Sequence, residues 1–187
     1  LRELNEIPGD FRIRFMTSHP KDCTKELIDT IASCGKVVNH LHLPVQSGPD
    51  RVLKAMNRHY TRNGYLELLD YAKQRIPGIP FTSDITVGFP GELEEDFLET
   101  LKLVEAVQSQ SLFTFVYSVR QGTKAATMSD PVSREEKMRW FQRLLDVQAP
   151  VSDRHHQALV GKTVRVLAEG EGESGAGFLT GRSDQNI

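Results

Sequence analysis

Apolar and polar residues along this 187-residue chain follow two different periods. Segments rich in β-branched and aromatic residues alternate with segments in which apolar residues recur every three or four positions. The first pattern is typical of strands, and the second of helices that bury one face. Their alternation predicts βαβ crossovers and therefore an α/β fold with a parallel sheet. We expect strands at residues 11–16, 37–45, 80–87 and 112–117.

Capping residues and helix breakers mark the helix boundaries. Thr24 can cap a first helix, and Gly35 can end it. Ser133 and Glu136 have the spacing of a capping box at the start of the last helix, which Pro150 is expected to kink or divide. Further helices are predicted to begin near residues 50, 61 and 92.

A different pattern begins at Leu159. It predicts a strand over residues 163–169, a glycine-rich turn over 170–177 and a second short strand over 178–181. We therefore divide the chain into an α/β unit, residues 1–157, and the beginning of a small β domain, residues 158–187. Two strands are marginal alone, so we expect this domain to continue in the natural protein. The first residues read as the end of a helix, which suggests that the natural N-terminus lies upstream.

Composition excludes some classes of partner. The apolar fraction of 39% and the charged fraction of 26% are ordinary for soluble domains, and no apolar run is long enough to span a membrane. A net charge of −2 provides no general attraction for nucleic acid, so any RNA contact must come from local basic patches. Cys23 and Cys34 match no metal-ligand spacing, and so few cysteines fit the reducing cytoplasm.

Two local basic patches are present. The first patch could bind RNA or could simply be the solvated face of a helix. Their candidate RNA-binding residues are Arg51, Lys54 and Arg58 in the first patch, and Arg120 and Lys124 in the second.

Polar residues gather where the predicted strands end, which is where ligands bind in parallel α/β sheets. They favour a ligand with several hydrogen-bonding groups. Asp84 lies inside a strand that should be buried, so it needs either a partner or a task. His40 and His42 share a strand face, but we interpret them as hydrogen-bonded structural residues because no third metal ligand recurs near them. The strand ends carry Ser18, His19, Gln46, Ser47, Gly88, Glu92, Tyr117 and Ser118.

Several motifs together resemble one enzyme family. The run His-Leu-Pro-Val-Gln-Ser-Gly at residues 42–48, the continuation at 50–58, Val-Gly-Phe-Pro-Gly-Glu at 87–92 and Phe-Thr-Phe at 113–115 resemble the radical S-adenosylmethionine (SAM) methylthiotransferases. Within that family the chain is most similar to the members that methylthiolate isopentenyladenosine beside the tRNA anticodon. Residues 159–162 resemble the opening of a TRAM domain, which binds RNA in this family.

This resemblance implies the later part of a radical SAM partial (β/α) barrel followed by the start of a TRAM-type β domain. It implies SAM and two [4Fe-4S] clusters as cofactors, the anticodon stem-loop of tRNA as substrate, and flavodoxin or ferredoxin as reductant. Neither cysteine belongs to the family's CxxxCxxC motif, so we expect the cluster ligands upstream of residue 1 and no activity from this chain alone.

The resemblance also implies roles for individual residues, while no catalytic residue and no metal ligand is assigned. Gln46 and Ser47 would face the ribose hydroxyls of SAM, and the turn at residues 87–92 would lie near its adenine. Ser18 and His19 would lie at the methionine end or near the substrate base. The full set of predicted cofactor-binding residues is Ser18, His19, Gln46, Ser47, Asp84, Gly88, Glu92, Tyr117 and Ser118.

Three alternatives remain open at this point. A sister enzyme in the same family modifies an aspartate of ribosomal protein S12. A TIM-like enzyme that binds a phosphate ester would share the general fold, because a fold does not determine a function. A non-catalytic RNA-binding module would bind RNA in a salt-dependent way without any cofactor.

Overall fold

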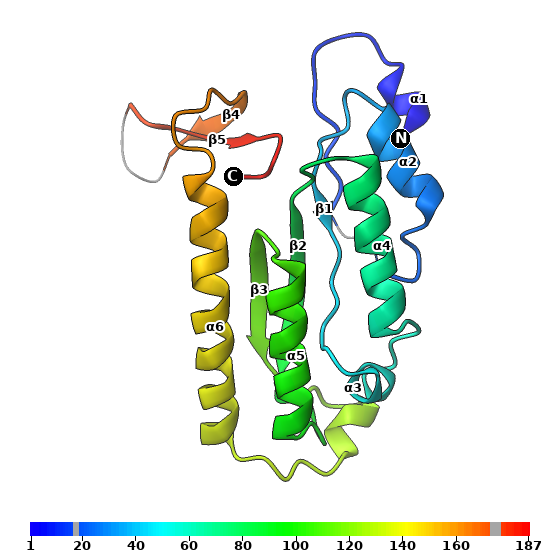
Figure 1. The fold of residues 1–187 in the computed structure, drawn as a ribbon, viewed down its shortest axis with the longest axis vertical. Helices are drawn as coiled ribbons and strands as arrows, with labels where there is room; N and C mark the ends of the chain where they lie inside the picture. The colour runs from blue at the N-terminus through cyan, green and yellow to red at the C-terminus, as the bar shows by residue number, and fades with distance from the viewer. Residues whose placement is uncertain (17–18, 173–176) are drawn as a thin grey trace.

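The computed structural model describes residues 1–16, 19–172 and 177–187 (Figure 1). The predicted residue Ser18, with Thr17, lies outside the described residues. In chain order, the elements are α1 (Arg2–Asn5), α2 (Lys25–Ser33), β1 (Leu41–His42), α3 (Asp50–Ala55), α4 (Arg62–Arg75), β2 (Phe81–Val87), α5 (Glu94–Val107), β3 (Ser111–Val116), the 3-10 helix η1 (Lys124–Thr127), α6 (Arg134–Gln157), β4 (Val166–Glu171) and β5 (Leu179–Ser183).

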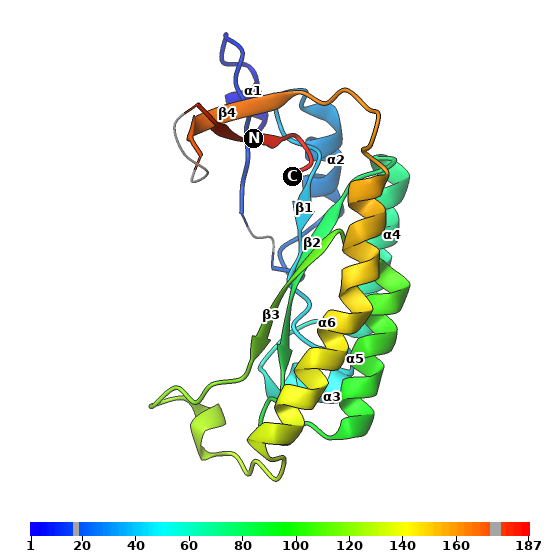
Figure 2. The same cartoon turned by 90° about the vertical axis from the view of Figure 1, so that its left-hand side faces the viewer.

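The predicted parallel sheet is confirmed. Its strand order is β1-β2-β3, and both pairs are parallel, with Leu41 opposite Phe81 and Thr82 opposite Ser111. Helices α4, α5 and α6 all lie on one side of this sheet (Figure 2). Their apolar faces pack against buried strand residues such as Ile85, and Phe97 of α5 stacks on Trp140 of α6 with ring centroids 5.3 Å apart.

The first two predicted strands are much shorter than expected. Residues 11–16 contribute one isolated parallel bridge between Ile13 and Val37, and residues 37–45 form a regular strand only at Leu41–His42. The N–H of His40 donates to the Val38 carbonyl at 2.9 Å, a tight turn that interrupts the ladder. Pro44 has no N–H to donate on the other side. Pairing resumes at Gln46, which bridges to Ile85.

Two helices start at the predicted caps, Thr24 and Ser133, and α4 starts after Thr61, near the predicted residue. The side chains of Thr24, Thr61 and Ser133 accept hydrogen bonds from the backbone N–H three residues later. Pro150 was expected to kink or divide the last helix, and it does not divide it, because α6 runs unbroken from Arg134 to Gln157. Contacts on both sides of the proline hold it: Gln148 donates to the Ser109 carbonyl and Ser152 to the Gln110 carbonyl, both at 2.9 Å.

We call the sheet face that points away from the helices the inner face. It carries Thr82, Asp84 and Thr86 of β2 and Phe113 and Phe115 of β3. Side chains alternate between the faces of a strand, so these residues point away from the helical layer. Phe113 and Phe115 are 46% and 52% exposed. The inner face is therefore the open surface of a sheet whose other face is buried.

The predicted second unit begins as an antiparallel pair, β4 with β5, at the end of the sheet opposite α3 (Figure 1). The residues after β5 contact the first segment of the chain. Arg12 Nε donates to the Asp184 carboxylate at 2.6 Å, and Arg14 donates to the Asn186 side chain at 2.8 Å. Within the described part of the chain, no helix combines the length and apolar character needed to cross a membrane.

Gly48 gives a test of the packing between the loop after β1 and α5. A Cβ at this position would lie 2.6 Å from the carbonyl oxygen of Glu99 and from the backbone of Thr100. Both contacts are backbone atoms of a packed helix and cannot move aside. We expect Gly48→Ala to lower the free energy of unfolding by about 1–3 kcal/mol in urea titrations. Gly35→Ala is the control, since a Cβ there meets no atom within 4 Å, and an equal loss in both variants would contradict the account.

Candidate functional site

A cavity of about 440 Å³ lies at the carboxyl ends of β2 and β3. Its walls come from the ends of both strands, from the residues after α3 and from the loop that follows β3. Parallel strands bring their carboxyl ends to one edge, so segments far apart in sequence meet here. The residues that matter most for its chemistry are Gln46, Arg58, Thr86, Phe89, Tyr117 and Ser118.

Two polar atoms of the cavity walls are buried and have no hydrogen-bond partner among the described residues. They are Nε of Arg58 and the hydroxyl of Tyr117. Buried polar groups are almost always hydrogen-bonded, so these two atoms are exceptions within side chains that line the cavity. Local backbone geometry positions both residues. Asn57 takes a left-handed conformation just before Arg58, and the Tyr117 N–H donates to the Val87 carbonyl at 2.9 Å.

Gln46 enters the cavity wall through an unusual backbone conformation, with φ of 72°. Its N–H donates to the Asp84 carbonyl at 2.8 Å, and its carbonyl accepts from the Thr86 N–H at 2.9 Å. A left-handed residue other than glycine carries strain of order 1 kcal/mol or more, and such strain clusters at functional positions. Pairing with β2 on both sides holds Gln46 in this conformation.

The turn at residues 88–92 is held by a buried carboxylate. Oε2 of Glu92 accepts hydrogen bonds from the N–H groups of Gly88 at 2.6 Å and of Phe89 at 3.1 Å. Glu92 is 2% exposed, and this burial raises its pKa to about 7. Gly88 is left-handed, and a Cβ there would lie 2.5 Å from the side chain of Lys137. The turn places Phe89 in the cavity wall, edge-on to Tyr117 with ring centroids 5.3 Å apart.

The predicted cofactor residues do not all lie in the cavity wall. Gln46, Tyr117 and Ser118 line the cavity. Ser47 is fully buried and lies 3.4 Å from the Thr100 hydroxyl, away from the cavity. His19 packs edge-on against the Tyr60 ring, and burial lowers its pKa.

Three other predicted residues, Asp84, Gly88 and Glu92, do not line the cavity but contact residues that do. Asp84 accepts a hydrogen bond from the Gln46 amide at 3.4 Å, and the other two shape the turn that carries Phe89.

The basic residues also separate by position. Arg58 and Arg120 line the cavity itself. Arg51 is paired with the Asp96 carboxylate, which raises the arginine's pKa, and it donates to the Gly91 carbonyl at 2.9 Å. Lys54 and Lys124 are exposed on the surface. Only the first pair is therefore placed to touch a ligand inside the cavity.

Sequence reasoning missed several cavity residues. Thr86 and Phe115 lie on predicted strands, and their alternation with buried neighbours was a usable signal. Thr123 and Ala125 come from the loop after β3, where Gly122 is left-handed and the Thr123 hydroxyl donates to the Arg120 carbonyl at 2.8 Å. Nothing in the pattern of that loop indicated that it would fold back over the strand ends.

The two histidines behave as the sequence suggested. His40 Nε2 lies 3.1 Å from the Thr82 hydroxyl, and His42 Nδ1 lies 2.9 Å from the same oxygen. Burial lowers the pKa of both, that of His40 to about 4. Across the described ranges, no group of three His, Cys, Asp or Glu side chains could hold a metal ion.

Comparison with known families now adds to this geometry. Residues 1–104 match the model of the radical SAM superfamily. The chain belongs to this superfamily. Members of this superfamily use SAM, from which it takes its name, together with an iron–sulfur cluster. A TM-score of 0.63 relates the fold to coproporphyrinogen III oxidase from Escherichia coli, a radical SAM enzyme, at 22% identity over 75% of this chain and 32% of that one.

Much closer relatives carry one name, tRNA-2-methylthio-N(6)-dimethylallyladenosine synthase. The protein of that name from Alkaliphilus oremlandii is 50% identical over all of this chain, and that from Clostridium tetani is 48% identical over 98% of it. The counterpart from Acetivibrio thermocellus is 49% identical over the whole chain. The chain spans about 40% of the length of these curated relatives.

Of the two cofactors that the family uses, the residues of this chain fit SAM but not the iron–sulfur cluster. SAM carries ribose hydroxyls, an adenine and a charged methionine end, which suit a cavity with an amide, an aromatic wall and unpaired donors. An iron–sulfur cluster needs several thiolates. Cys23 and Cys34 are both buried, and no metal-binding group exists in the part of the chain that the structure describes, so these residues do not fit a cluster.

Glu92 gives a pH-dependent prediction for the turn. Its pKa in the folded protein is about 7 and its reference value is 4.5, so the folded state binds more protons than the unfolded state between these values. Stability should therefore fall as pH rises from about 5 to about 8, by at most roughly 1.4 kcal/mol per pH unit. We expect Glu92→Gln to flatten this dependence in urea titrations at several pH values. The exposed Glu95→Gln serves as control, and a Glu92→Gln curve as steep as the wild-type curve would contradict the assignment.

Proposed function

We propose that this chain is the SAM-binding and RNA-facing part of a tRNA methylthiotransferase that modifies N6-dimethylallyladenosine. Superfamily membership and about 50% identity to relatives of that name, along the entire chain, support the proposal. The structural observation that carries it is the cavity at the strand ends, with Gln46 in its wall and unpaired donors on Arg58 and Tyr117. Because the chain spans about 40% of its relatives, activity is proposed for the complete protein.

In this proposal the cavity binds the adenosyl part of SAM. The Gln46 amide offers a donor and an acceptor to the ribose hydroxyls. Phe89 and Tyr117 form an aromatic wall for the adenine, with Ser118 beside it. When bound and reduced by one electron from the family's iron–sulfur cluster, SAM would supply the abstraction of a hydrogen atom from an unreactive carbon. This chain's residues hold and orient the cofactor and exclude water around it.

The remaining predicted residues have supporting roles in the same proposal. Asp84, Gly88 and Glu92 hold the walls in place, and Ser47 anchors the loop after β1 to α5. His19 lies beside Tyr60 and would face the methionine end of SAM or the substrate base, while Ser18, predicted for the same role, lies outside the described residues.

Further features follow from the relatives' name and the resemblance of motifs. We propose two [4Fe-4S] clusters in the complete enzyme, with ligands from outside this chain, and flavodoxin or ferredoxin as the electron donor. Residues 1–157 would form the barrel part and 158–187 the start of a TRAM domain, in a cytoplasmic enzyme. The β4–β5 hairpin lies at the end of the sheet remote from α3 (Figure 1), so its RNA contacts would be far from the reacting base.

Arg58 and Arg120 are proposed to bind phosphates next to the target base. Both line the cavity, and phosphate groups account for much of the affinity of proteins for nucleic acid. The other three basic residues, Arg51, Lys54 and Lys124, would add contacts around the rim. Arg51 already has Asp96 as a partner, so its contribution should be smaller.

The main test is the methylthio mark itself. A strain that lacks the gene should lose 2-methylthio-N6-dimethylallyladenosine from its tRNA, as measured by nucleoside mass spectrometry. Complementation with Gln46→Ala should restore less than about a tenth of the mark, because a buried hydrogen bond to the cofactor is lost. Gln142→Ala, a change of the same type on the exposed face of α6, should restore it fully. An intact mark in the deletion strain would refute the function, and loss of an aspartate modification on ribosomal protein S12 would favour the sister activity.

A second test separates the cavity arginine from the rim arginine. Arg120→Ala should weaken binding of a prenylated anticodon stem-loop about 3–10-fold and reduce the slope of log affinity against log salt by about 1. Arg51→Ala is the matched control and should change affinity less than about twofold, since its guanidinium is engaged by Asp96. Fluorescence anisotropy over a salt series measures both, and a larger loss for Arg51→Ala would overturn the assignment.

A further inference from the structure

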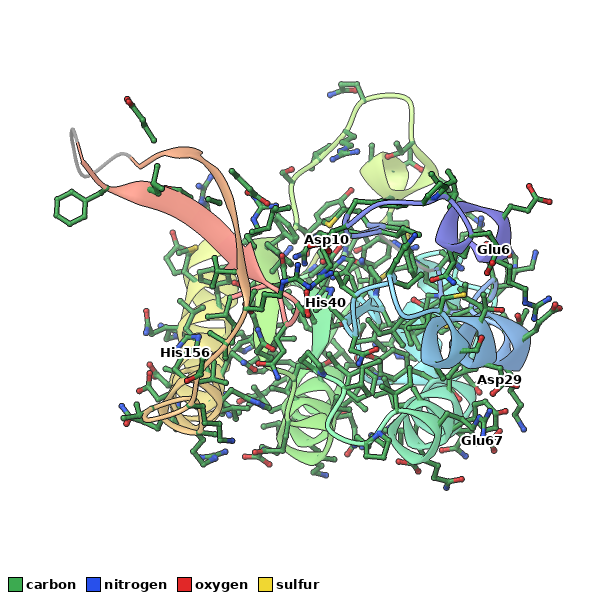
Figure 3. All side chains as sticks on the ribbon, turned by 90° about the horizontal axis from the view of Figure 1, so that it is seen from above. Glu6, Asp10, Asp29, His40, Glu67 and His156 are labelled. Carbon is green, nitrogen blue, oxygen red and sulfur yellow. The ribbon has the colours of Figure 1, made fainter. Side chains whose placement is uncertain are left out.

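Arginines and acids pair across the junction between the sheet and the β4–β5 hairpin. Arg12 Nε donates to the Asp184 carboxylate at 2.6 Å. Arg165, just before β4, pairs with Asp10 in the opposite direction. In Figure 3, which looks down from the end of the molecule that carries the hairpin, Asp10 lies near the middle, whereas Asp29 lies at the periphery. The two parts of the chain thus exchange ion pairs in both directions.

Strand alternation aims the arginines of the first segment. Ile13 is buried, its N–H donates to the Lys36 carbonyl at 2.7 Å, and its carbonyl accepts from the Val38 N–H at 3.0 Å. Side chains alternate along an extended segment, so Arg12 and Arg14, on either side of Ile13, share the opposite face. Both arginines therefore extend from a backbone that is fixed to the core.

The residues after β5 form a tight turn that receives these arginines. Asn186 is left-handed, with φ of 63°, and its N–H donates to the Ser183 carbonyl at 3.0 Å. Arg14 donates to the Asn186 side chain at 2.8 Å and to the Ser183 carbonyl at 3.0 Å. Gln110, which is buried before β3, donates to the Gln185 carbonyl at 3.2 Å. Two segments of the α/β unit therefore hold the turn.

We call Arg12, Arg14 and Gln110, together with their partners at residues 183–186, the clamp. The Arg12 side chain is 19% exposed, whereas that of Arg75 in a surface ion pair is 51% exposed, so the Arg12 pair is screened less by salt. The chain joins the hairpin to α6 through residues 158–165. The clamp is a second attachment, which removes the hinge freedom that a single link would leave.

The hairpin and the cavity lie toward opposite ends of the sheet (Figure 1). A strand rises about 3.3 Å per residue, so the seven residues of β2 alone separate them by roughly 20 Å. A single nucleotide in the cavity cannot reach the hairpin, but the stem of a tRNA can. When two regions bind one ligand, the affinity that the second region adds depends on how well their spacing matches the ligand. Rigid spacing also avoids the loss of freedom on binding.

We propose that Arg12 and Arg14 are positioning residues for tRNA, because they hold the hairpin at a fixed distance from the cavity. The two regions then bind one RNA molecule as a rigid pair. This inference rests on the proposed function, and it adds the basis on which the enzyme prefers an entire tRNA to a short RNA that carries the same base. Neither arginine lines the cavity, so both act through the hairpin.

The test compares an entire tRNA with a pentanucleotide, both carrying N6-dimethylallyladenosine, for binding to the complete enzyme by fluorescence anisotropy. In the double variant Arg12→Ala/Arg14→Ala, affinity for the tRNA should fall about tenfold, while affinity for the pentanucleotide should change less than about twofold. Arg75→Ala is the matched control, because Arg75 pairs with Asp29 between α4 and α2, and it should leave both affinities as in wild type.

Asp184 separates positioning from direct attraction of RNA. Asp184→Ala removes a negative charge, which on electrostatic grounds alone would strengthen RNA binding. It also removes the partner of Arg12, so we expect tRNA binding to weaken about 3–10-fold instead. Amide hydrogen exchange at residues 178–186 should become faster in this variant, since the turn is released from the sheet.

Exchange of the two charges gives an independent comparison. Arg12→Asp should weaken tRNA binding, and the addition of Asp184→Arg should restore it to within about threefold of wild type, because the ion pair is rebuilt with reversed polarity. This comparison decides the matter if the alanine variants do not fold. In turnover, the loss should appear as a higher KM for tRNA with little change in kcat.

The possible failures are distinguishable. Equal or tighter tRNA binding by Asp184→Ala, or equal losses for the tRNA and the pentanucleotide in the double variant, would overturn the positioning role and leave the proposed function standing. Failure of the wild-type enzyme to bind tRNA would remove the proposed function and this inference with it.

Discussion

The pairing of Gln46 with β2 is the interaction on which the site depends. Two backbone hydrogen bonds, to Asp84 and Thr86, hold a left-handed residue in register beside the end of a parallel strand. Pro44 interrupts the ladder before that point, and the Ser83 hydroxyl spans the gap by accepting from the Val45 N–H and donating to the Leu43 carbonyl, so the segment stays beside β2 up to Gln46. Without it the Gln46 amide would leave the cavity wall.

The two faces of β2 have different roles. Ile85 and its neighbours pack under the helices and provide stability, while Asp84 and Thr86 on the inner face carry polar contacts toward the cavity. Polar groups in a half-buried sheet are costly unless they are hydrogen-bonded, and here Asp84 accepts from the Gln46 side-chain amide while the Thr86 hydroxyl donates to its oxygen.

Sequence patterns predicted the parallel sheet, the helix starts and the edge of the sheet where the cavity lies. Period and capping chemistry are local properties, so Thr24 and Ser133 could be identified as caps directly. The short ladder around Leu41 could not be, because it depends on a tight turn at Val38 that no residue type demanded. Pro150 does not end the last helix, because contacts on both sides of it offset the loss of one helical hydrogen bond.

Individual site residues were harder to predict than the site. Gln46 was recognised from its place after a strand, but its conformation and its ties to Asp84 required the structure. Ser47 stood next to it in sequence and proved to be buried against Thr100. Arg120 and Thr123 reach the cavity only through the path of a loop, and loop paths are not encoded in periodicity.

The most direct test of the central claim is a crystal structure of the complete enzyme with S-adenosylhomocysteine. The account predicts the ribose hydroxyls within hydrogen-bonding distance of the Gln46 amide and the adenine against Phe89 and Tyr117. A ligand bound elsewhere, with the Gln46 amide facing solvent or another side chain, would contradict it.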